Sequence, residues 1–369
     1  MTVTELPSTE LVAALGTVID PEIRRPITEL DMVGATSVVD GVASVDLKLT
    51  IVGCPAADRI EADVRAAALR VPGVTAVDLN VGVMTREERE ALTLKLRGGR
   101  ARGNQFAADS LTRIYAITSG KGGVGKSSLT ANLGVAMAAR GLRVGIIDAD
   151  VFGFSIPGLL GLSGERPTKV GELIMPPVAH DVKVISIGMF VEQGTAVSWR
   201  GPMLHRTIQQ FLGDVHFGDL DVLLLDLPPG TGDVAISLGQ LLPHAEVIVV
   251  TTPQPAAAEV AERSALVARQ TGQTVIGVIE NMAGLAQPDG SVLPLFGEGG
   301  GAAVAERLGV PVLASIPLSI ALREGGDAGE PVTLTTPADA AAAAIAALAE
   351  RLATRPRGLA GKPLGVSLR

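Results

Sequence analysis

The spacing of apolar and polar residues in the first part of the chain is typical of a small mixed unit. Helical spacing alternates with the every-second-residue pattern of half-buried strands, and Asp40-Gly41 marks a tight turn between two of them. The expected elements are two helices, at residues 8–19 and 56–70, and three strands, at residues 33–39, 42–49 and 74–81. The pattern therefore predicts a compact α+β domain over residues 1–85, close to the smallest size that folds alone.

The next stretch, residues 86–110, is polar and charged and has no long apolar pattern. Arg97-Gly98-Gly99-Arg100 and Arg102-Gly103-Asn104 lie at its centre. Glycine and charge together are typical of an exposed linker. Its basic residues could contact an acidic partner, but a solvated charge run needs no partner to be stable.

From Leu111 to the end of the chain, short apolar strands alternate with helical segments. This rhythm predicts a mostly parallel sheet covered by helices, in a second domain over residues 111–369. The alanine-rich stretch near the end has Ile345, Leu348 and Leu352 at helical spacing, which predicts a closing helix packed on the sheet. The expected strands are at residues 114–118, 144–148, 182–187, 222–226, 247–252, 274–280 and 312–316.

Composition supports this α/β class and narrows the expected partners. Hydrophobic residues make up 47% of the 369 residues but aromatic residues only 2%, so aliphatic side chains and alanine must build the core. A net charge of -8 and a pI of about 5.2 provide no general attraction for nucleic acid. No stretch approaches a membrane span, and the first residues do not resemble a leader. We therefore expect a cytoplasmic protein that binds neither nucleic acid nor membrane.

Cysteine and histidine are scarce, which limits the metal sites that one chain can build. Cys54 is the single cysteine, so a cysteine cage for a metal would need a second subunit. The four histidines, His180, His205, His216 and His244, lack metal-ligand spacing. We assign the histidines no role.

The segment Gly120-Lys121-Gly122-Gly123-Val124-Gly125-Lys126-Ser127 fits the phosphate-loop pattern between a strand and a helix. Glycines allow backbone N–H groups to turn toward phosphates, Lys126 neutralises the β and γ oxygens, and the Ser127 hydroxyl binds Mg²⁺. The predicted fold is therefore a P-loop NTPase. The predicted nucleotide-binding residues are Gly120, Lys121, Gly122, Gly123, Val124, Gly125, Lys126, Ser127, Ser128, Asn281 and Pro317.

Three aspartates follow predicted strands that end at the same sheet edge as the loop. Asp226 is expected to hold Mg²⁺ through water, and Asp148 to lie near the ion. Asp150 is the candidate for orienting the attacking water, although an aspartate that caps a turn is the alternative. The stiff segment Pro228 to Asp233 follows Asp226 and is a candidate switch that responds to loss of the γ-phosphate.

The base is expected to be adenine. Guanine-specific enzymes usually have Asn-Lys-x-Asp after a late strand, whereas this chain has Asn281-Met282-Ala283-Gly284. Asn281 can hydrogen-bond the base edge, and Ile316-Pro317 can lie against its face.

The loop has a second lysine, Lys121. With it the loop resembles the deviant Walker A group, which includes MinD, ParA, ArsA and the nitrogenase iron protein. The resemblance implies that Lys121 reaches the phosphates of a facing subunit. There it would act as an arginine finger does, supplying positive charge in the transition state. The expected catalytic residues are thus Lys121 and Asp150, in a homodimer.

Within that group the chain resembles the Mrp/ApbC family of iron-sulfur cluster carriers over nearly its whole length. The N-terminal unit, with Asp20-Pro21-Glu22 and Gly53-Cys54-Pro55, resembles the small domain of SufT-type assembly factors. The motifs that carry the main resemblance are Gly120 to Ser128, Asp148 to Gly153 with Ser155-Ile156-Pro157, Arg200 to Met203, Asp226 to Asp233, Glu280-Asn281-Met282 and Phe296 to Gly301.

One departure concerns the cluster ligands. Many family members have Cys-x-x-Cys between the segments that match Asn281-Met282 and Phe296-Gly297, so that two thiolates per subunit hold a bridging [4Fe-4S] cluster. Residues 283–295 of this chain contain no cysteine. Cys54, just before a predicted helix, is the remaining candidate ligand for a cluster, a sulfur species or a client cysteine. The helix N-terminus could lower its pKa, although Asp20 and Glu22 would oppose that shift.

The resemblance implies an ATP-hydrolysing carrier or maturation factor that delivers iron-sulfur clusters, with apoprotein clients and assembly factors as partners. A second interpretation is a ParA/MinD-like switch that positions cargo on DNA or membrane. The net negative charge of the chain disfavours it. A third is an adaptor ATPase that recruits targets through its N-terminal domain and binds no cluster.

Overall fold

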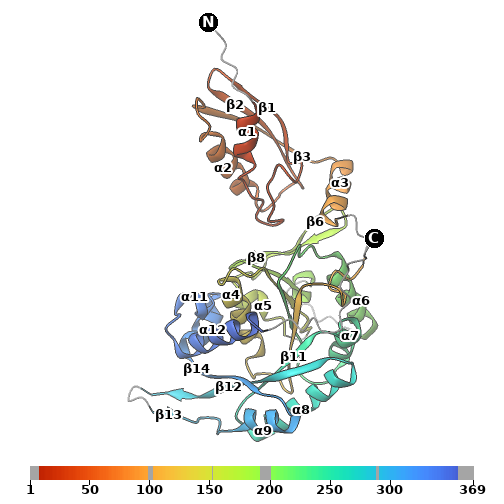
Figure 1. Cartoon of the computed structure of the whole chain (residues 1–369), viewed down its shortest axis with the longest axis vertical. Helices are drawn as coiled ribbons and strands as arrows, with labels where there is room; N and C mark the ends of the chain where they lie inside the picture. The colour runs from red at the N-terminus through yellow and green to blue at the C-terminus, as the bar shows by residue number, and fades with distance from the viewer. Residues whose placement is uncertain (1–7, 99–102, 152, 192–200, 288–290, 356–369) are drawn as a thin grey trace, which may run out of the picture.

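The computed structural model places a small N-terminal domain at one end of a larger domain, which gives an elongated molecule (Figure 1). The structure describes residues 8–98, 103–151, 153–191, 201–287 and 291–355. The two predicted fold classes are confirmed: a small α+β unit precedes an α/β P-loop domain with a mostly parallel sheet.

The N-terminal domain is a three-stranded sheet covered by two helices. Its sheet order is β1-β2-β3, with β1 antiparallel and β3 parallel to the central β2. Alternate residues of β2 are buried, as expected for a sheet with one face on a core. The elements are α1 (Ser8–Leu15), β1 (Val33–Val39), β2 (Val42–Leu49), α2 (Ala57–Ala68) and β3 (Ala76–Val83), which matches the five predicted elements within a few residues at each end.

The stretch predicted to be a linker contains a helix, α3 (Arg86–Leu96). Thr85 and Glu88 form a capping box, in which the Thr85 hydroxyl accepts from the Glu88 N–H at 3.2 Å and the Glu88 carboxylate accepts from the Thr85 N–H at 2.7 Å. Leu92 and Thr93 are buried. Residues 86–96 of the predicted linker therefore form a capped helix, and residues 99–102 lie outside the described part. The boundaries at 85 and 110 stay a prediction.

The larger domain is built on one sheet with a parallel centre. Along the sheet the order is β13-β12-β11-β4-β10-β5-β9-β8, with β14 also paired to β12. Short antiparallel additions, β8 and β13, lie at the two edges. The strands are β4 (Arg113–Ser119), β5 (Val144–Asp148), β8 (Val178–Ala179), β9 (Val182–Ser186), β10 (Val222–Asp226), β11 (Glu246–Thr251), β12 (Thr274–Ala286), β13 (Val292–Leu293) and β14 (Val312–Leu318).

Helices pack on this sheet in two groups, one on each face (Figure 1). The first group surrounds α4 (Lys126–Ala138) and consists of α5 (Ile156–Leu159), α10 (Ile320–Ala328), α11 (Val332–Thr335) and α12 (Ala340–Ala353). The second surrounds α8 (Pro255–Gln270) and consists of α6 (Gly201–Asp214), α7 (Asp233–Leu241) and α9 (Gly300–Leu308). The predicted closing helix is α12, and its Ile345, Leu348 and Leu352 are buried as expected.

A hairpin from the larger domain completes the N-terminal core. It consists of β6 (Thr168–Val170) and β7 (Leu173–Met175). Val170, Leu173 and Met175 pack in the same cluster as the N-terminal side chains. Figure 1 shows β6 next to α3, at the end of the larger domain that faces the N-terminal domain. The two domains thus share hydrophobic packing as well as a chain connection.

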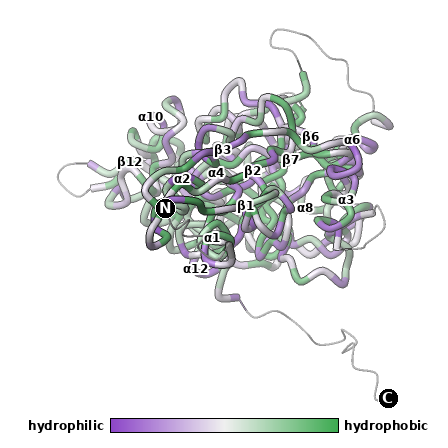
Figure 2. Tube along the Cα trace, turned by 90° about the horizontal axis from the view of Figure 1, so that it is seen from above, coloured by the Kyte–Doolittle hydropathy of each residue, from purple (hydrophilic) through white to green (hydrophobic). Residues whose placement is uncertain are grey.

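At the other end, β12 continues past the sheet and pairs with β13 as a hairpin that extends from the body in both views (Figure 1; Figure 2). Leu293 and Leu295 of this segment are exposed. Within the described ranges, no helix is long and apolar enough to cross a membrane.

Candidate nucleotide site

The phosphate loop joins β4 to α4, as predicted, and two of its glycines are required by close contacts. A side chain on Gly120 would collide with the backbone of α8 at Val260 and Ala261. Gly125 has a φ of 78°, and a Cβ there would collide with the Asn281 amide. The sequence therefore allows the loop to turn tightly against two neighbouring elements.

Lys126 lies beside Asp226 at the base of the loop. Its ammonium is 2.8 Å from an Asp226 oxygen, and both side chains are buried. The Ser127 hydroxyl donates to Asp226 at 2.6 Å, and Thr130 donates to the other oxygen at 3.0 Å. The carboxylate of Asp226 and the hydroxyl of Ser127 are hard oxygen ligands that Mg²⁺ accepts. The structure therefore brings together the predicted lysine and two of the predicted magnesium ligands.

Asp148 lies next to Asp226 across paired strands β5 and β10, but its carboxylate has other partners. It accepts hydrogen bonds from Ser186 Oγ at 3.0 Å and from the N–H groups of Asp150 at 3.1 Å and Ile156 at 3.3 Å. Burial, and then the charge of Asp226, raise the pKa of Asp148 well above its usual range. The side chain organises the turn that follows β5, and its expected place near Mg²⁺ stays a prediction.

Asp150 is carried by that turn to the edge of a cavity of about 760 Å³. Its carboxylate lies 4.0 Å from the Lys126 ammonium. The cavity is also lined by Pro228 and Pro229 of the predicted switch. Its size suits a nucleotide-sized ligand. Residues 121–128 also line this wall, as do Asp233 and Val234 at the start of α7.

Lys121 points to a neighbouring helix of its own chain. Its ammonium donates to Gln254 Oε1 at 2.9 Å, and Gln254 precedes α8 as its N-cap residue. This contact holds the second lysine at the rim of the cavity, which Lys121 also lines.

The two residues predicted to contact the base lie elsewhere than the cavity wall. Asn281 Nδ2 donates to the Val124 carbonyl at 2.9 Å, so its amide braces the phosphate loop. Pro317 lies in β14, half-buried. Neither residue lines the phosphate-loop cavity. Their contact with adenine stays a prediction.

The predicted switch segment is tied to the loop through backbone and hydroxyl contacts. The Gly230 N–H donates to the Ser119 carbonyl at 2.8 Å. Ser264 Oγ lies within hydrogen-bond distance of both carbonyls, at 3.2 Å for Ser119 and 3.3 Å for Gly230. Movement of the switch would therefore be transmitted to α8, which carries Ser264.

Cys54 is buried at the start of the segment leading to α2. Burial raises the pKa of its thiol, and the charges of Glu22 and Asp20 add to that shift, while N–H groups of Ala56 and Ala57 oppose it. The helix N-terminus thus acts in the expected direction, but burial outweighs it, so the expectation of a lowered pKa is wrong for the net shift. Asp20 and Glu22 do lie near enough to affect Cys54, as the resemblance implied.

Sequence reasoning missed three residues that complete the site: Thr130, Ser186 and Gln254. Thr130 follows Ser127 at helical spacing, so it could have been found from the loop motif. Ser186 ends β9 and Gln254 follows β11, two strands that end at the same sheet edge, which is a weaker signal. Their contacts with Asp148 and Lys121 depend on packing between distant segments.

Comparison with known proteins agrees with this geometry. The model of a family described as NUBPL iron-transfer P-loop NTPase matches residues 110–353, and one described as Iron-sulfur cluster assembly protein matches residues 8–79. The chain belongs to this family of iron-sulfur cluster carrier P-loop NTPases. It is 56% identical over 362 residues to the iron-sulfur cluster carrier protein of Mycobacterium tuberculosis, covering 96% of this chain and 95% of that protein.

More distant carriers and a solved structure extend the similarity. The Escherichia coli iron-sulfur cluster carrier protein is 36% identical, covering 91% of this chain and 88% of that protein. A nucleotide-binding protein of Archaeoglobus fulgidus, solved in complex with ADP, is 34% identical with a TM-score of 0.52, covering 66% of this chain and 91% of that one. The recognition of a carrier family with a P-loop fold is confirmed.

Some family motifs cannot be placed, and one is missing. Phe152 and Arg200 lie outside the described residues. Residues 283–295 have no cysteine, and within the described part of the chain no group of three His, Cys, Asp or Glu side chains could hold a metal ion.

Proposed function

We propose that this carrier couples ATP hydrolysis in a homodimer to delivery of iron-sulfur clusters to apoproteins in the cytoplasm. The observation that supports the ATPase part is the buried contact of Lys126 with Asp226 beneath a strand–loop–helix motif. Membership of the carrier family supports the proposal that the cargo is an iron-sulfur cluster.

In the proposed reaction, loop N–H groups and Lys126 hold the β and γ phosphates of ATP, as in other phosphate loops. Ser127 and Asp226 would hold Mg²⁺, which neutralises phosphate charge when bound. Asp148 keeps the turn after β5 in place through its contact with Ile156 N–H. That turn presents Asp150 to the cavity, where it orients the attacking water.

Lys121 is proposed to leave Gln254 and serve the partner's active site. Loss of this hydrogen bond from a charged ammonium costs about 1.5–3 kcal/mol, and the phosphate charge of a nucleotide bound to the partner can compete for it. This arrangement makes hydrolysis depend on dimer formation. Asn281 and Pro317 are proposed to complete the adenine end of the site after the dimer closes.

Cargo binding is proposed to involve Cys54, the only thiol of the chain. Two subunits supply two thiolates, so a [4Fe-4S] cluster would need further ligands from a client protein or a small thiol. A buried thiol with a raised pKa must become exposed before it can bind iron. Contact with an apoprotein client or an assembly factor would provide that exposure.

The absence of cysteine in residues 283–295 favours a second function, a cluster-free adaptor ATPase. In this alternative the N-terminal domain recruits clients and the ATPase dimer controls their access to another cluster source.

Anaerobic reconstitution of the wild type and Cys54→Ser decides between the two. For the carrier, Cys54→Ser should lose bound iron, the visible absorption of the cluster and transfer to an apo-client, while ATPase activity persists. Ala67→Ser is the matched control, because it also buries a hydroxyl in the N-terminal core. Equal iron and equal transfer in all three proteins would favour the adaptor.

A further inference from the structure

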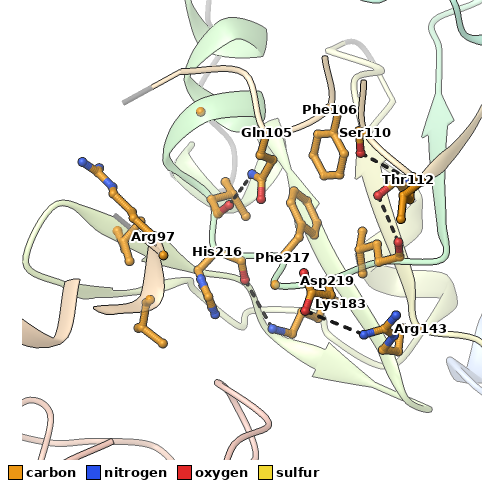
Figure 3. Close-up of a pocket in the computed structure, with 18 of the residues that line it drawn as sticks. Arg97, Gln105, Phe106, Ser110, Thr112, Arg143, Lys183, His216, Phe217 and Asp219 are labelled. Carbon is orange, nitrogen blue, oxygen red and sulfur yellow. Dashed lines mark hydrogen bonds and ion pairs between the residues drawn. The ribbon is translucent and has the colours of Figure 1, made fainter. Parts of the chain in front are cut away.

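A second cavity, of about 940 Å³, lies where the two domains meet (Figure 3). Its walls come from both domains: Arg24 and Arg25 belong to the N-terminal domain, and Lys183 and His216 to the larger one. The phosphate loop does not line it. The reaction described above uses none of these four side chains.

Lys183 is a buried cation with few partners. Lys183 is the second residue of β9 and is 3% exposed. Among the described residues its ammonium makes one hydrogen bond, a long one of 3.3 Å to the His216 carbonyl. No described carboxylate lies within ion-pair distance of it. An ammonium removed from water needs compensating partners, so this one is incompletely satisfied.

The His216 ring faces the same point as Lys183. A Cβ placed on Gly218 would lie 3.9 Å from both Lys183 Nζ and His216 Nε2, so the two nitrogens approach one small region. Figure 3 shows both side chains beside the loop that carries Phe217. The His216 ring makes no hydrogen bond with the described residues. Burial, and then Lys183 and Arg25, lower the pKa of His216 to about 3, so the ring is neutral near pH 7.

The charged side chains around Lys183 and His216 are mostly positive. Arg24 pairs with Asp181 at 3.1 Å, but Asp181 is 84% exposed and does not line the cavity. Within the described ranges, the Arg25 side chain has one ion pair, a long contact of 3.9 Å to Glu29. Asp20 and Glu22 act favourably on Lys183 but are also absent from the wall.

Carboxylates that do line the cavity are mostly engaged. Asp219 and Asp221 pair with Arg143, which shares the wall with them. Asp109 is exposed. The carboxylates that line the cavity therefore do not neutralise Lys183, whose charge is offset only in part by Asp20 and Glu22 outside the wall.

We propose that this interdomain cavity binds a small organic oxyanion, with Lys183 and His216 as its inner contacts and Arg24 and Arg25 as contacts from the N-terminal domain. A phosphate or a carboxylate group would accept hydrogen bonds from the ammonium and the guanidinium groups. The cavity is larger than inorganic phosphate needs and lies within the range of small-molecule sites. Because both domains contribute, binding would stabilise their contact.

The test uses the histidine ring signals of the full-length protein, which has four histidines. ADP with Mg²⁺ is kept saturating so that the phosphate loop is filled. Inorganic phosphate and succinate are the two probes, one for each anion chemistry, and His216→Gln assigns the His216 signal. We expect a saturable shift of that signal with at least one probe, and the stronger probe identifies the anion class. A non-saturating drift of all four signals with both probes would overturn the proposal.

Lys183→Met should weaken binding of the effective probe about ten-fold or more, because it removes a charged donor and keeps the apolar stem. The matched control, Lys169→Met, removes an exposed lysine from β6 and should leave binding unchanged. If Lys183→Met does not fold, Arg24→Gln is the alternative variant for the same measurement, and it should also weaken binding. Wild-type affinity in a folded Lys183→Met protein would show that the cavity is not the site.

Discussion

At the residue scale, the contact between Lys126 and Asp226 changes what a loop mutation is expected to do. An exposed phosphate loop suggests that its lysine can be removed without harm to the fold. Here Lys126 is 6% exposed and its ammonium neutralises a fully buried carboxylate. Removing one partner of a buried ion pair leaves an uncompensated charge. The residue therefore has a structural and a binding role.

We expect Lys126→Ala to lose nearly all ATP affinity and about 3–5 kcal/mol of stability, since Asp226 is left unpaired. The double variant Lys126→Ala with Asp226→Asn should regain much of the stability but none of the affinity. Nucleotide titration and thermal unfolding of the three proteins check this. Near-normal ATP affinity in the single variant would remove the site assignment.

His216 should make the protein sensitive to acid. Its folded pKa of about 3 lies below the unfolded value of 6.5, so between these values the unfolded chain binds a proton that the folded chain does not. Stability from this group is present above pH 6.5 and is lost as pH falls toward 3. In thermal unfolding from pH 7 to pH 4, His216→Gln should gain stability relative to the wild type as pH falls. His205→Gln is the control, and a pH-independent difference for His216→Gln would contradict the expectation.

At the scale of elements, α3 shows how a polar segment becomes ordered. Its sequence is charged, but the capping box at Thr85 and Glu88 satisfies two N–H groups at its start. On its inner face the Thr93 hydroxyl donates to the Val170 carbonyl of the β6–β7 hairpin at 3.2 Å. The helix thus forms because it has both a local cap and a surface to pack on.

Thr85→Ala should destabilise α3 by about 1 kcal/mol, the usual cost of losing an N-cap side chain. Hydrogen exchange of the α3 amides measures this locally, because a two-domain protein has no single unfolding free energy. Glu87→Gln, in the same first turn but outside the capping box, should change exchange much less. Unchanged protection in Thr85→Ala would show that packing alone holds the helix.

At the scale of the whole molecule, two copies are proposed to form each complete active site. Lys121 donates a hydrogen bond to Gln254 of its own chain, whereas Asp150 lies at the cavity wall beside Lys126. If Lys121 acts across the dimer, each site takes Asp150 from one subunit and Lys121 from the other. Charge supplied in this way is worth about 10³-fold or more in rate.

Lys121→Ala should therefore keep ATP binding and lose most hydrolysis, and Asp150→Ala should also be inactive. In a purified heterodimer of the two variants, one site regains both groups, so up to half of the wild-type activity should return. Phosphate release from tagged heterodimers, with each homodimer as control, measures this. An inactive heterodimer would contradict action across the dimer.

Much of the site could be predicted from adjacent residues alone. The loop from Gly120 to Ser127, with Asp226 at a strand end, depends on short contiguous patterns, because glycine conformations and strand rhythm are local properties. The α/β order and the closing helix follow from the same periodicities. These are the features on which the carrier family could be recognised before any coordinates.

Tertiary structure decided how those parts are used. Val170, Leu173 and Met175 pack in the N-terminal core and so join the two domains. The sequence predicted the order of the domains but not this contact. Burial of Cys54 beside Asp20 and Glu22 reversed the expected direction of its pKa shift. Lys183 and His216 meet because β9 and the segment after α6 come together in space. Desolvation and charge depend on neighbours that are distant in the chain, and no local pattern specifies them.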